Sequence, residues 1–401
     1  MKQTTPSAIA LGFLSILLVA SAANAQTNFQ YETPKDSKDY IGFYEPSPDI
    51  TPYPNPAGVK NVILLIGDGL GHNQITAARL VAAGPDGKLH MERIATASSI
   101  TTHAANAKIT DSAAAGTALA CGIKTNNGMI GMDPDGKRYQ TILQAAKHKG
   151  MSTGIAVTCE VTHATPAAFT AHVKSRSSEA RIAPQLLEQT DVILGGGRRY
   201  FLPADAGGRQ PEGVDLIKKA VDSGYTYASD AAGLNAARAP RLLGLFQNAA
   251  LETIPPEPDL AELTAKAIEI LSANPHGFFL MVEGSQIDWA CHNNNIRQTI
   301  RQTLLFDKAV KVAVDFALRD RSTLILVTSD HETGGLSIKN WDPETRKLDV
   351  AWSTGGHTGV PVPLYALGPG ARRFRGQLDN TDVPKHIAAL LGIDDFPKPL
   401  D

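Results

Sequence analysis

Short runs of consecutive apolar residues recur along this chain, and stretches with helical periodicity lie between them. The first run, Asn61-Val-Ile-Leu-Leu-Ile66, is apolar at successive positions, which is typical of a strand buried on both faces of a parallel sheet. Comparable runs occupy residues 154–158, 191–194, 277–282, 322–328 and 363–367. Helical patterns include residues 260–273 and 299–318. The alternation predicts an α/β fold, a single large domain with a mostly parallel central sheet flanked by helices.

The remaining segments indicate how the chain is organised. Its 401 residues are 43% hydrophobic and 19% charged, which is the composition of a globular protein with enough apolar residues for a large core. Residues 26–58 are rich in Pro, Tyr, Asp and Ser without periodicity, and we expect an extended N-terminal arm there. The main domain covers residues 59–401. Within it, residues 203–256 are rich in Ala, Gly and Pro and interrupt the alternation, which indicates a surface insertion.

Residues 1–25 have the features of a secretory signal peptide. A lysine is followed by an apolar stretch at residues 9–20 and an A-x-A-like cleavage site at residues 23–25. Because the apolar stretch is shorter than the ~20 residues of a membrane-spanning helix, we expect cleavage rather than anchoring. The mature chain would then begin at Gln26, be secreted and make no contact with a membrane. In a bacterium with an outer membrane its compartment would be the periplasm.

Charge and cysteine content exclude two classes of protein. The formal net charge is −2, and it becomes −3 when the signal peptide removes its single lysine. Such a balance argues against a nucleic-acid partner, and any anionic substrate must be held by local positive groups. The three cysteines, Cys121, Cys159 and Cys291, are too few for a disulfide scaffold, and one disulfide or none can form among them. We expect Cys291 to be a buried structural thiol.

Polar residues follow several of the predicted strands. Asp68 comes after the first strand, Glu283 after the run at 277–282, and Asp330 with His331 after the run at 322–328. The carboxyl ends of parallel strands meet at one edge of a sheet, where the active sites of open α/β folds form. We therefore expect these side chains to converge on one site.

Two pairs of acidic and imidazole residues indicate metal binding. Asp288 and His292 are four residues apart, so a helical turn places both on one face, and Asp330 with His331 form the second pair. Mixed nitrogen and oxygen ligands suit zinc better than calcium or magnesium. Taken alone, either pair is better explained as a surface hydrogen bond or salt bridge, and the other segments of the chain are needed to favour a metal.

Ser112 is the candidate nucleophile. It precedes an Ala-rich run that ends at Gly122 and has high helix propensity, so it lies at a predicted helix N-terminus, where free N–H groups favour an anion. Capping of this helix by Asp111 or Ser112 is the alternative explanation. No Ser-His-Asp relay is evident beside Ser112, and coordination to a metal is another way to activate its hydroxyl.

Seven segments of the chain form an ordered set. They are Asn61-Val-Ile-Leu-Leu-Ile-Gly-Asp-Gly69, Thr110-Asp-Ser-Ala-Ala-Ala-Gly-Thr-Ala118, His163-Ala-Thr-Pro-Ala-Ala168 with Ser175-Arg176, Asp191-Val-Ile-Leu-Gly-Gly-Gly-Arg198, Glu283 to His292, Ser329-Asp-His331 and Gly356-His-Thr-Gly359. These segments and their order resemble those of the alkaline phosphatases, and the resemblance extends from Lys60 to beyond Gly359. The resemblance implies the alkaline phosphatase fold and a catalytic domain over residues 59–401.

The resemblance also implies a centre of two zinc ions with a third metal beside them. The ligands of the first zinc would be Asp288, His292 and His357. Those of the second would be Asp68, Asp330, His331 and the reactive Ser112. The third ion, magnesium in the family, would use Asp68, Thr165 and Glu283. Arg176 would clamp the phosphate, because its planar fork of donors matches two phosphate oxygens.

The implied reaction is hydrolysis of phosphate monoesters to an alcohol and inorganic phosphate through a phosphoserine on Ser112. His163 and Trp289 stand beside the phosphate site where some members carry Asp and Lys, and His163 leaves the identity of the third metal open. Only 25 residues separate His331 from His357, too few for the crown-like insertion that larger members place there. A homodimer stays open, but not one built on that insertion.

Other functions have to be weighed against this one. Phosphodiesterases and sulfatases of the same superfamily share much of the metal framework. Diesterases of the pyrophosphatase type use Thr as the nucleophile, and sulfatases need a Cys/Ser-x-Pro-x-Arg context, which Asp111-Ser112-Ala113-Ala114 lacks. A non-catalytic periplasmic protein that binds metal or phosphate is the remaining alternative, and such a protein has no use for a serine between the metals.

Overall fold

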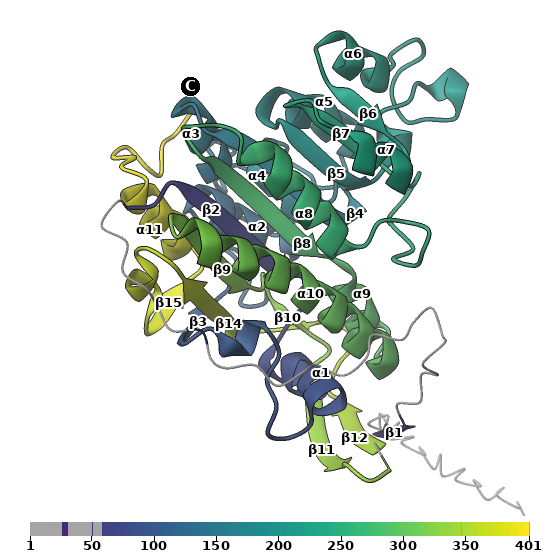
Figure 1. The fold of residues 1–401 in the computed structure, drawn as a ribbon, viewed down its shortest axis with the longest axis vertical. Coiled ribbons are helices and arrows are strands. Elements are labelled where there is room, and N and C mark those ends of the chain that lie inside the picture. Colours follow the sequence, from purple (N-terminus) through teal and green to yellow (C-terminus); the bar gives the residue numbers. More distant parts are fainter. Residues whose placement is uncertain (1–25, 31–49, 51–57, 346, 401) are drawn as a thin grey trace, which may run out of the picture.

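The computed structural model describes residues 26–30, 50, 58–345 and 347–400. Its main feature is a ten-stranded sheet with the order β15-β3-β14-β9-β2-β8-β4-β5-β7-β6, covered by helices (Figure 1). The predicted signal peptide lies outside the described residues, as does most of the arm at 26–58. Residues Gln26–Gln30 of that arm form a strand, β1.

Five parallel strands form the centre of the sheet, and they confirm the predicted fold class. In spatial order they are β9 (Thr323–Thr328), β2 (Asn61–Gly67), β8 (Phe278–Gly284), β4 (Ser152–Glu160) and β5 (Val192–Gly196). Every residue of β9, β2 and β8 is buried. Burial on both faces explains why their sequences are continuously apolar rather than alternating.

Antiparallel pairing occurs at one side of the sheet, whereas the parallel order continues at the other. On one side β14 (Val362–Leu367) runs antiparallel to both β9 and β3 (Thr96–Thr101), and β15 (Gln377–Asp379) pairs parallel with β3. On the other side β7 (Leu242–Leu245) and β6 (Thr226–Ala228) extend the sheet beyond β5. Because these two strands belong to the segment 203–256, the alternation continues through that segment instead of stopping there. They are only four and three residues long, too short to form a recognisable apolar run.

Helices pack on both faces of the sheet. One face is covered by α1 (His72–Ala83), α8 (Leu260–Leu271), α9 (Gln286–His292) and α10 (Ile296–Asp320), whose apolar residues join Ile63 and Leu65 of β2 in one core. The opposite face is covered by α2 (Ser112–Cys121), α3 (Ile142–His148), α4 (Ala164–Thr170), α5 (Glu179–Gln189) and α11 (Asp382–Leu390). Two short helices, α6 (Leu216–Asp222) and α7 (Ala231–Ala236), lie beside the β6 edge. Single 3-10 turns occur at Met91–Arg93, Arg198–Tyr200, Ala204–Ala206 and Ala371–Phe374.

A small antiparallel sheet occupies the interval between His331 and His357. It consists of the hairpin β11 (Leu336–Asp342) and β12 (Lys347–Trp352), with β1 paired to β12. Figure 1 shows it next to α1, at the end of the molecule opposite to α6. A two-stranded ladder of β10 (Glu332–Thr333) and β13 (His357–Thr358) joins the base of this interval to the main domain. The hairpin thus connects β10, which follows His331, to β13, which begins at His357.

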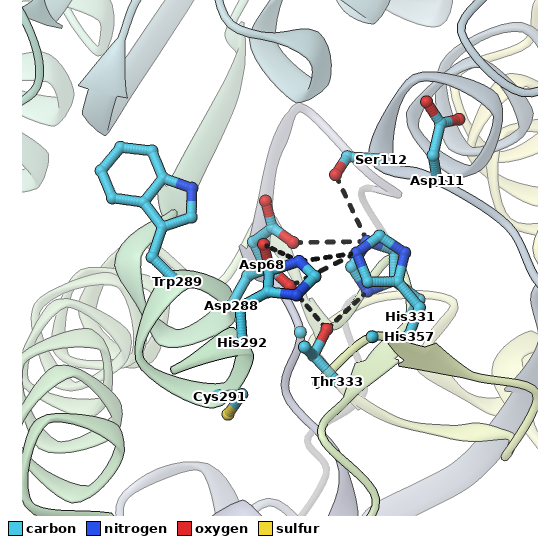
Figure 2. A network of polar contacts seen from close by, with 12 residues as sticks. Asp68, Asp111, Ser112, Asp288, Trp289, Cys291, His292, His331, Thr333 and His357 are labelled. Carbon is cyan, nitrogen blue, oxygen red and sulfur yellow. Dashed lines mark hydrogen bonds and ion pairs between the residues drawn. The ribbon is translucent and has the colours of Figure 1, made fainter. Parts of the chain in front are cut away.

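No described helix combines the length and the apolar character that would let it cross a membrane. The carboxyl ends of β2, β8 and β9 meet near α9 and the N-terminus of α2, and the candidate site lies at this edge (Figures 1 and 2).

Candidate metal centre

Helix α9 brings the first acid and imidazole pair together. His292 Nε2 lies 3.3 Å from Asp288 Oδ2, as the i, i+4 spacing predicts. His357, 65 residues further on, joins them, with its Nε2 3.6 Å from Asp288 Oδ1 and 3.1 Å from His292 Nε2. Two imidazole nitrogens and one carboxylate therefore face the same small volume, which is a donor set typical of zinc (Figure 2).

Backbone carbonyls orient both imidazoles. His292 Nδ1 lies 2.7 Å from the Gly355 oxygen, and His357 Nδ1 lies 2.7 Å from the Thr110 oxygen. A carbonyl only accepts, so each Nδ1 donates its proton, and each Nε2 is the nitrogen left to face a metal. In the ion-free chain the hydrogen bond to Asp288 raises the pKa of His292 to about 9. Burial opposes ionisation of Asp288, but hydrogen bonds from His292 and Thr333 lower its pKa overall.

The second cluster is fully buried. Asp68, Asp330 and His331 are all 0% exposed, and His331 Nε2 lies 3.2 Å from Asp330 Oδ2 and 3.6 Å from Asp68 Oδ1. Both carboxylate oxygens of Asp68, and Oδ2 of Asp330, accept no hydrogen bond from any described residue. Burial and the neighbouring carboxylates, Asp330 first, raise the pKa of Asp68 well above its ordinary value. Buried carboxylates without partners are strongly unfavourable unless a cation neutralises them, so this cluster fits a divalent metal.

Glu283 extends the acidic cluster on the other side of Asp68. It lies inside β8 rather than after it, one residue before the strand ends, and is 0% exposed. Its Oε1 accepts no hydrogen bond from the described residues, and Thr165 at the start of α4 is buried beside it. Burial, with the charge of Asp330 adding to it, raises the pKa of Glu283 to about 7. The oxygen donors expected for a third metal are therefore present in one place.

Ser112 is the first residue of α2, and its hydroxyl is not used as the helix cap. Asp111 takes that role, since its Oδ1 accepts a hydrogen bond of 2.9 Å from the Ala114 nitrogen. The Ser112 hydroxyl instead lies 3.3 Å from His331 Nε2 (Figure 2). The structure thus resolves the alternative left by the sequence, because Asp111 caps the helix while Ser112 faces the second cluster.

Arg176 lies beside this helix terminus. Its Nη1 donates to Asp111 Oδ2 at 3.1 Å, and its Nη2 lies 3.2 Å from His163 Nε2. The His163 ring meets Trp289 edge-on, with 5.9 Å between the ring centroids. Burial and the Arg176 charge lower the pKa of His163 to about 4, so its imidazole is neutral around pH 7. Arg176 is thus a cation beside Asp111, the neighbour of Ser112, and the two rings that follow it, His163 and Trp289, are neutral.

Thr333 connects the two imidazole clusters, although no sequence pattern indicated a role for it. Its hydroxyl donates to Asp288 Oδ1 at 2.5 Å and lies 3.2 Å from His331 Nδ1. Because the single hydroxyl proton is used on Asp288, the second contact requires His331 Nδ1 to donate. That fixes His331 with its Nε2 lone pair directed at the second cluster.

We expect Thr333→Val to weaken zinc binding about 10- to 100-fold, the usual effect of removing a residue that orients metal ligands. Valine matches threonine in shape but cannot hold either Asp288 or His331. Zinc dissociation constants from competition with a chelator provide the measurement, and Thr333→Ser, which keeps the hydroxyl, serves as the control. Equal affinities in the wild type and the valine variant would contradict this role.

The three cysteines are free and buried. Cys291 Sγ lies 3.6 Å from Thr299 Oγ1 and 3.9 Å from Gln74 Nε2, on the side of α9 away from His292 (Figure 2). This arrangement agrees with the expected structural thiol.

Most of this chain is similar to known proteins. A sequence model of the alkaline phosphatase family matches residues 59–346 and 339–393. Alkaline phosphatase 4 of Bacillus subtilis is 34% identical over 84% of this chain and 89% of its own length, and alkaline phosphatase of Escherichia coli is 35% identical over 83% and 86%. The alkaline phosphatase structure from the Antarctic bacterium TAB5 superimposes with a TM-score of 0.75 at 32% identity, covering 84% of this chain and 98% of that one. A His-to-Glu mutant of the TAB5 enzyme has Mg bound in its M3 site.

Proposed function

Because the chain belongs to the alkaline phosphatase family, we infer that its hydrolysis of phosphate monoesters proceeds through a phosphoserine on Ser112 at a centre of two zinc ions and a third divalent ion. The first zinc is assigned to Asp288, His292 and His357, and the second to Asp68, Asp330, His331 and Ser112. The observation that carries the proposal is the Ser112 hydroxyl at a helix N-terminus, 3.3 Å from His331 in a cluster where both Asp68 oxygens and Asp330 Oδ2 accept no hydrogen bond from a described residue.

The metals, when bound, promote ionisation of hydroxyl groups and neutralise charge on the phosphate oxygens. The chain itself supplies the nucleophile and the positioning. The Ser112 oxygen forms a bond to phosphorus while the bond from phosphorus to the alcohol oxygen breaks, and the alcohol leaves with a proton. In the second step a water oxygen attacks the phosphoserine, the Ser112 oxygen leaves, and inorganic phosphate is released.

The N-terminus of α2 and Arg176 bind the oxygens that do not react. Free N–H groups in the first turn of the helix point at an anion next to Ser112. Asp111 holds Nη1 of Arg176 in place, and its own carboxylate is in turn fixed by the Ala114 and Gly128 nitrogens. His163 and Trp289 border the phosphate without adding charge.

Arg176→Lys should raise both KM for a phosphate monoester and the inhibition constant of phosphate, each by roughly 10- to 100-fold, the range expected for losing one or two charge-assisted hydrogen bonds. A lysine keeps the charge but lacks the planar fork that serves Asp111 and phosphate together. Steady-state kinetics with phosphate as inhibitor test this. The exposed neighbour Lys174 provides the control, since Lys174→Ala should change neither constant. Unchanged constants in Arg176→Lys would show that Arg176 does not bind the phosphate.

The proposed activity is tested with three related substrates on one protein sample of known metal content. We expect turnover of 4-nitrophenyl phosphate to exceed that of bis(4-nitrophenyl) phosphate and 4-nitrophenyl sulfate by orders of magnitude. A preference for the diester or the sulfate would indicate instead a phosphodiesterase or a sulfatase of the same superfamily. Zinc binding without turnover of any of the three would indicate a carrier.

The location of the protein is proposed from residues 1–25 alone. Their pattern of charge, apolar stretch and small residues predicts secretion. In an organism with an outer membrane, the enzyme would then act on phosphate monoesters in the periplasm. A homodimer also remains a prediction.

A further inference from the structure

Cys159 lies against the third metal site. Its Sγ, a ring nitrogen of His163 and a carboxylate oxygen of Glu283 all lie within 4.8 Å of one another. Cys159 belongs to β4 and Glu283 to the neighbouring parallel strand β8, and the thiol is 3.4 Å from Glu283 Oε2 and 3.2 Å from the Glu160 carbonyl oxygen. Sulfur, nitrogen and oxygen donors from three elements, β4, β8 and the start of α4, therefore converge.

Unused donor atoms at this place point to a ligand. Glu283 is 0% exposed, and its Oε1 accepts no hydrogen bond from the described residues. Arg176 Nη2 donates to His163 Nε2, so the neutral ring carries its proton on Nδ1, which is buried and has no acceptor in the described part of the chain. A metal bound at Nδ1 requires this proton to move to Nε2 and Arg176 to release the ring. Buried polar atoms are normally paired, so unpaired atoms on two neighbouring residues need an explanation. An ion bound among them provides it.

The other two cysteines show what an inert buried thiol looks like in this fold. Among the residues that the structure describes, Cys121 Sγ forms one hydrogen bond, to the Tyr139 carbonyl oxygen at 3.7 Å, and Cys291 Sγ lies near the Thr299 hydroxyl and the Gln74 amide. Among the described residues, neither belongs to a group of donors that could hold a metal, whereas Cys159 does. Burial alone therefore does not account for the surroundings of Cys159.

The donor set decides which ion fits. Magnesium prefers oxygen ligands in octahedral geometry, whereas thiolate and imidazole select zinc and similar ions. We propose that Cys159 is a ligand of the third ion, with Glu283 and His163, so that this site takes zinc or another thiophilic cation in preference to magnesium. The inference rests on the proposed metal centre and deepens it. As the sulfur–metal bond forms, the thiol proton leaves to solvent.

Cobalt(II) titration of the metal-free protein tests the inference without relying on activity. The two zinc clusters contain no sulfur donor, so cobalt bound there gives only the weak visible bands of nitrogen and oxygen ligation. A cobalt–thiolate bond adds an intense charge-transfer absorption in the near ultraviolet. We expect this absorption to grow with one equivalent of the three bound. Binding of three equivalents without it would overturn the proposal, and this wild-type measurement does not depend on any variant folding.

Cys159→Ser and the matched control Cys121→Ser locate the sulfur. The first should lose the charge-transfer absorption, bind the third zinc at least 10-fold more weakly and allow magnesium to compete at lower concentration, in keeping with the loss of a soft ligand. The control should match the wild type. Retention of the absorption in Cys159→Ser would contradict the assignment.

The outcomes separate this inference from the proposed function. Metal-dependent phosphatase activity with two sulfur-free cobalt sites and no thiolate absorption would support the phosphatase mechanism. The same result would show that Cys159 is not a metal ligand. Failure to bind any cobalt would overturn both.

Discussion

Replacing Ser112 with alanine should lower kcat for 4-nitrophenyl phosphate by roughly 10³-fold or more, since loss of a nucleophile leaves only the catalysis of the surrounding groups. The side chain is buried at the start of α2, and its hydroxyl contacts His331 rather than the helix backbone. Asp111 caps the helix, so the variant should fold and bind zinc normally. A small residual rate is expected, because water can still attack the substrate at the metal centre.

Two measurements separate a nucleophile from a residue that only shapes the site. Mass spectrometry of acid-quenched wild-type enzyme should find phosphate on Ser112, and the alanine variant should carry none. Ser175→Ala, an exposed serine beside Arg176, provides the matched control and should keep full activity. Near-normal turnover by Ser112→Ala, or a phosphate on another residue, would show that the nucleophile lies elsewhere.

The central strands could be predicted from the sequence, because burial on both faces of the sheet requires apolar residues at every position. The run at 61–66 is apolar throughout because both faces of β2 are covered, one by the helices that pack on Ile63 and the other by those that pack on Leu64. The direction of β14 was not predictable, because a buried strand has the same composition whether its neighbours are parallel or antiparallel. Strand β7 and the edge strand β6 were also missed, because strands of four and three residues are too short to form a recognisable apolar run.

Part of the candidate site could be predicted from the local spacing of residues in the sequence. The rest depends on contacts between residues that are far apart in the sequence. The pair Asp288 and His292 follows from helix geometry, and the position of Ser112 follows from the Ala-rich run after it. Thr333 and Cys159 could not be found this way, because their partners lie 45 and 124 residues away in the sequence. Neither residue type has a spacing that indicates these contacts, which form only where β10 meets α9 and where β4 pairs with β8.

Removal of the divalent ions should abolish phosphatase activity, and added zinc should restore it, because charge neutralisation and activation of Ser112 both depend on the metals. The same treatment should also destabilise the protein. Without cations, the fully buried carboxylates of Asp68, Glu283 and Asp330 repel one another, and neither oxygen of Asp68 accepts a hydrogen bond from a described residue. Activity after dialysis against a chelator, with and without added zinc, provides the first measurement, and full activity in metal-free protein would refute the mechanism.

The instability of the metal-free protein should depend on pH in a direction that the Glu283 pKa sets. Its pKa rises from the ordinary 4.5 to about 7 in the folded chain, so the folded state holds a proton between these values that the unfolded state has lost. Stability from this group is therefore complete below pH 4.5 and lost as pH rises through about 7. The difference corresponds to roughly 3 kcal/mol of unfolding free energy, and the raised pKa of Asp68 acts in the same direction.

Between about pH 5 and about pH 8, urea unfolding of the metal-free wild type should therefore show a fall in unfolding free energy relative to Glu283→Gln, because the lowered pKa values of His90 and His163 act in the opposite direction but are present in both proteins. Zinc-loaded protein should not show this fall, because metal binding strengthens as its ligands lose their protons. Glu283→Gln is the matched variant: an amide of the same shape does not titrate, so part of the pH dependence should disappear from the metal-free form. If the metal-free wild type loses no more stability than Glu283→Gln between the two pH values, the Glu283 carboxylate does not require a cation, and the electrostatic argument for the metal centre is wrong.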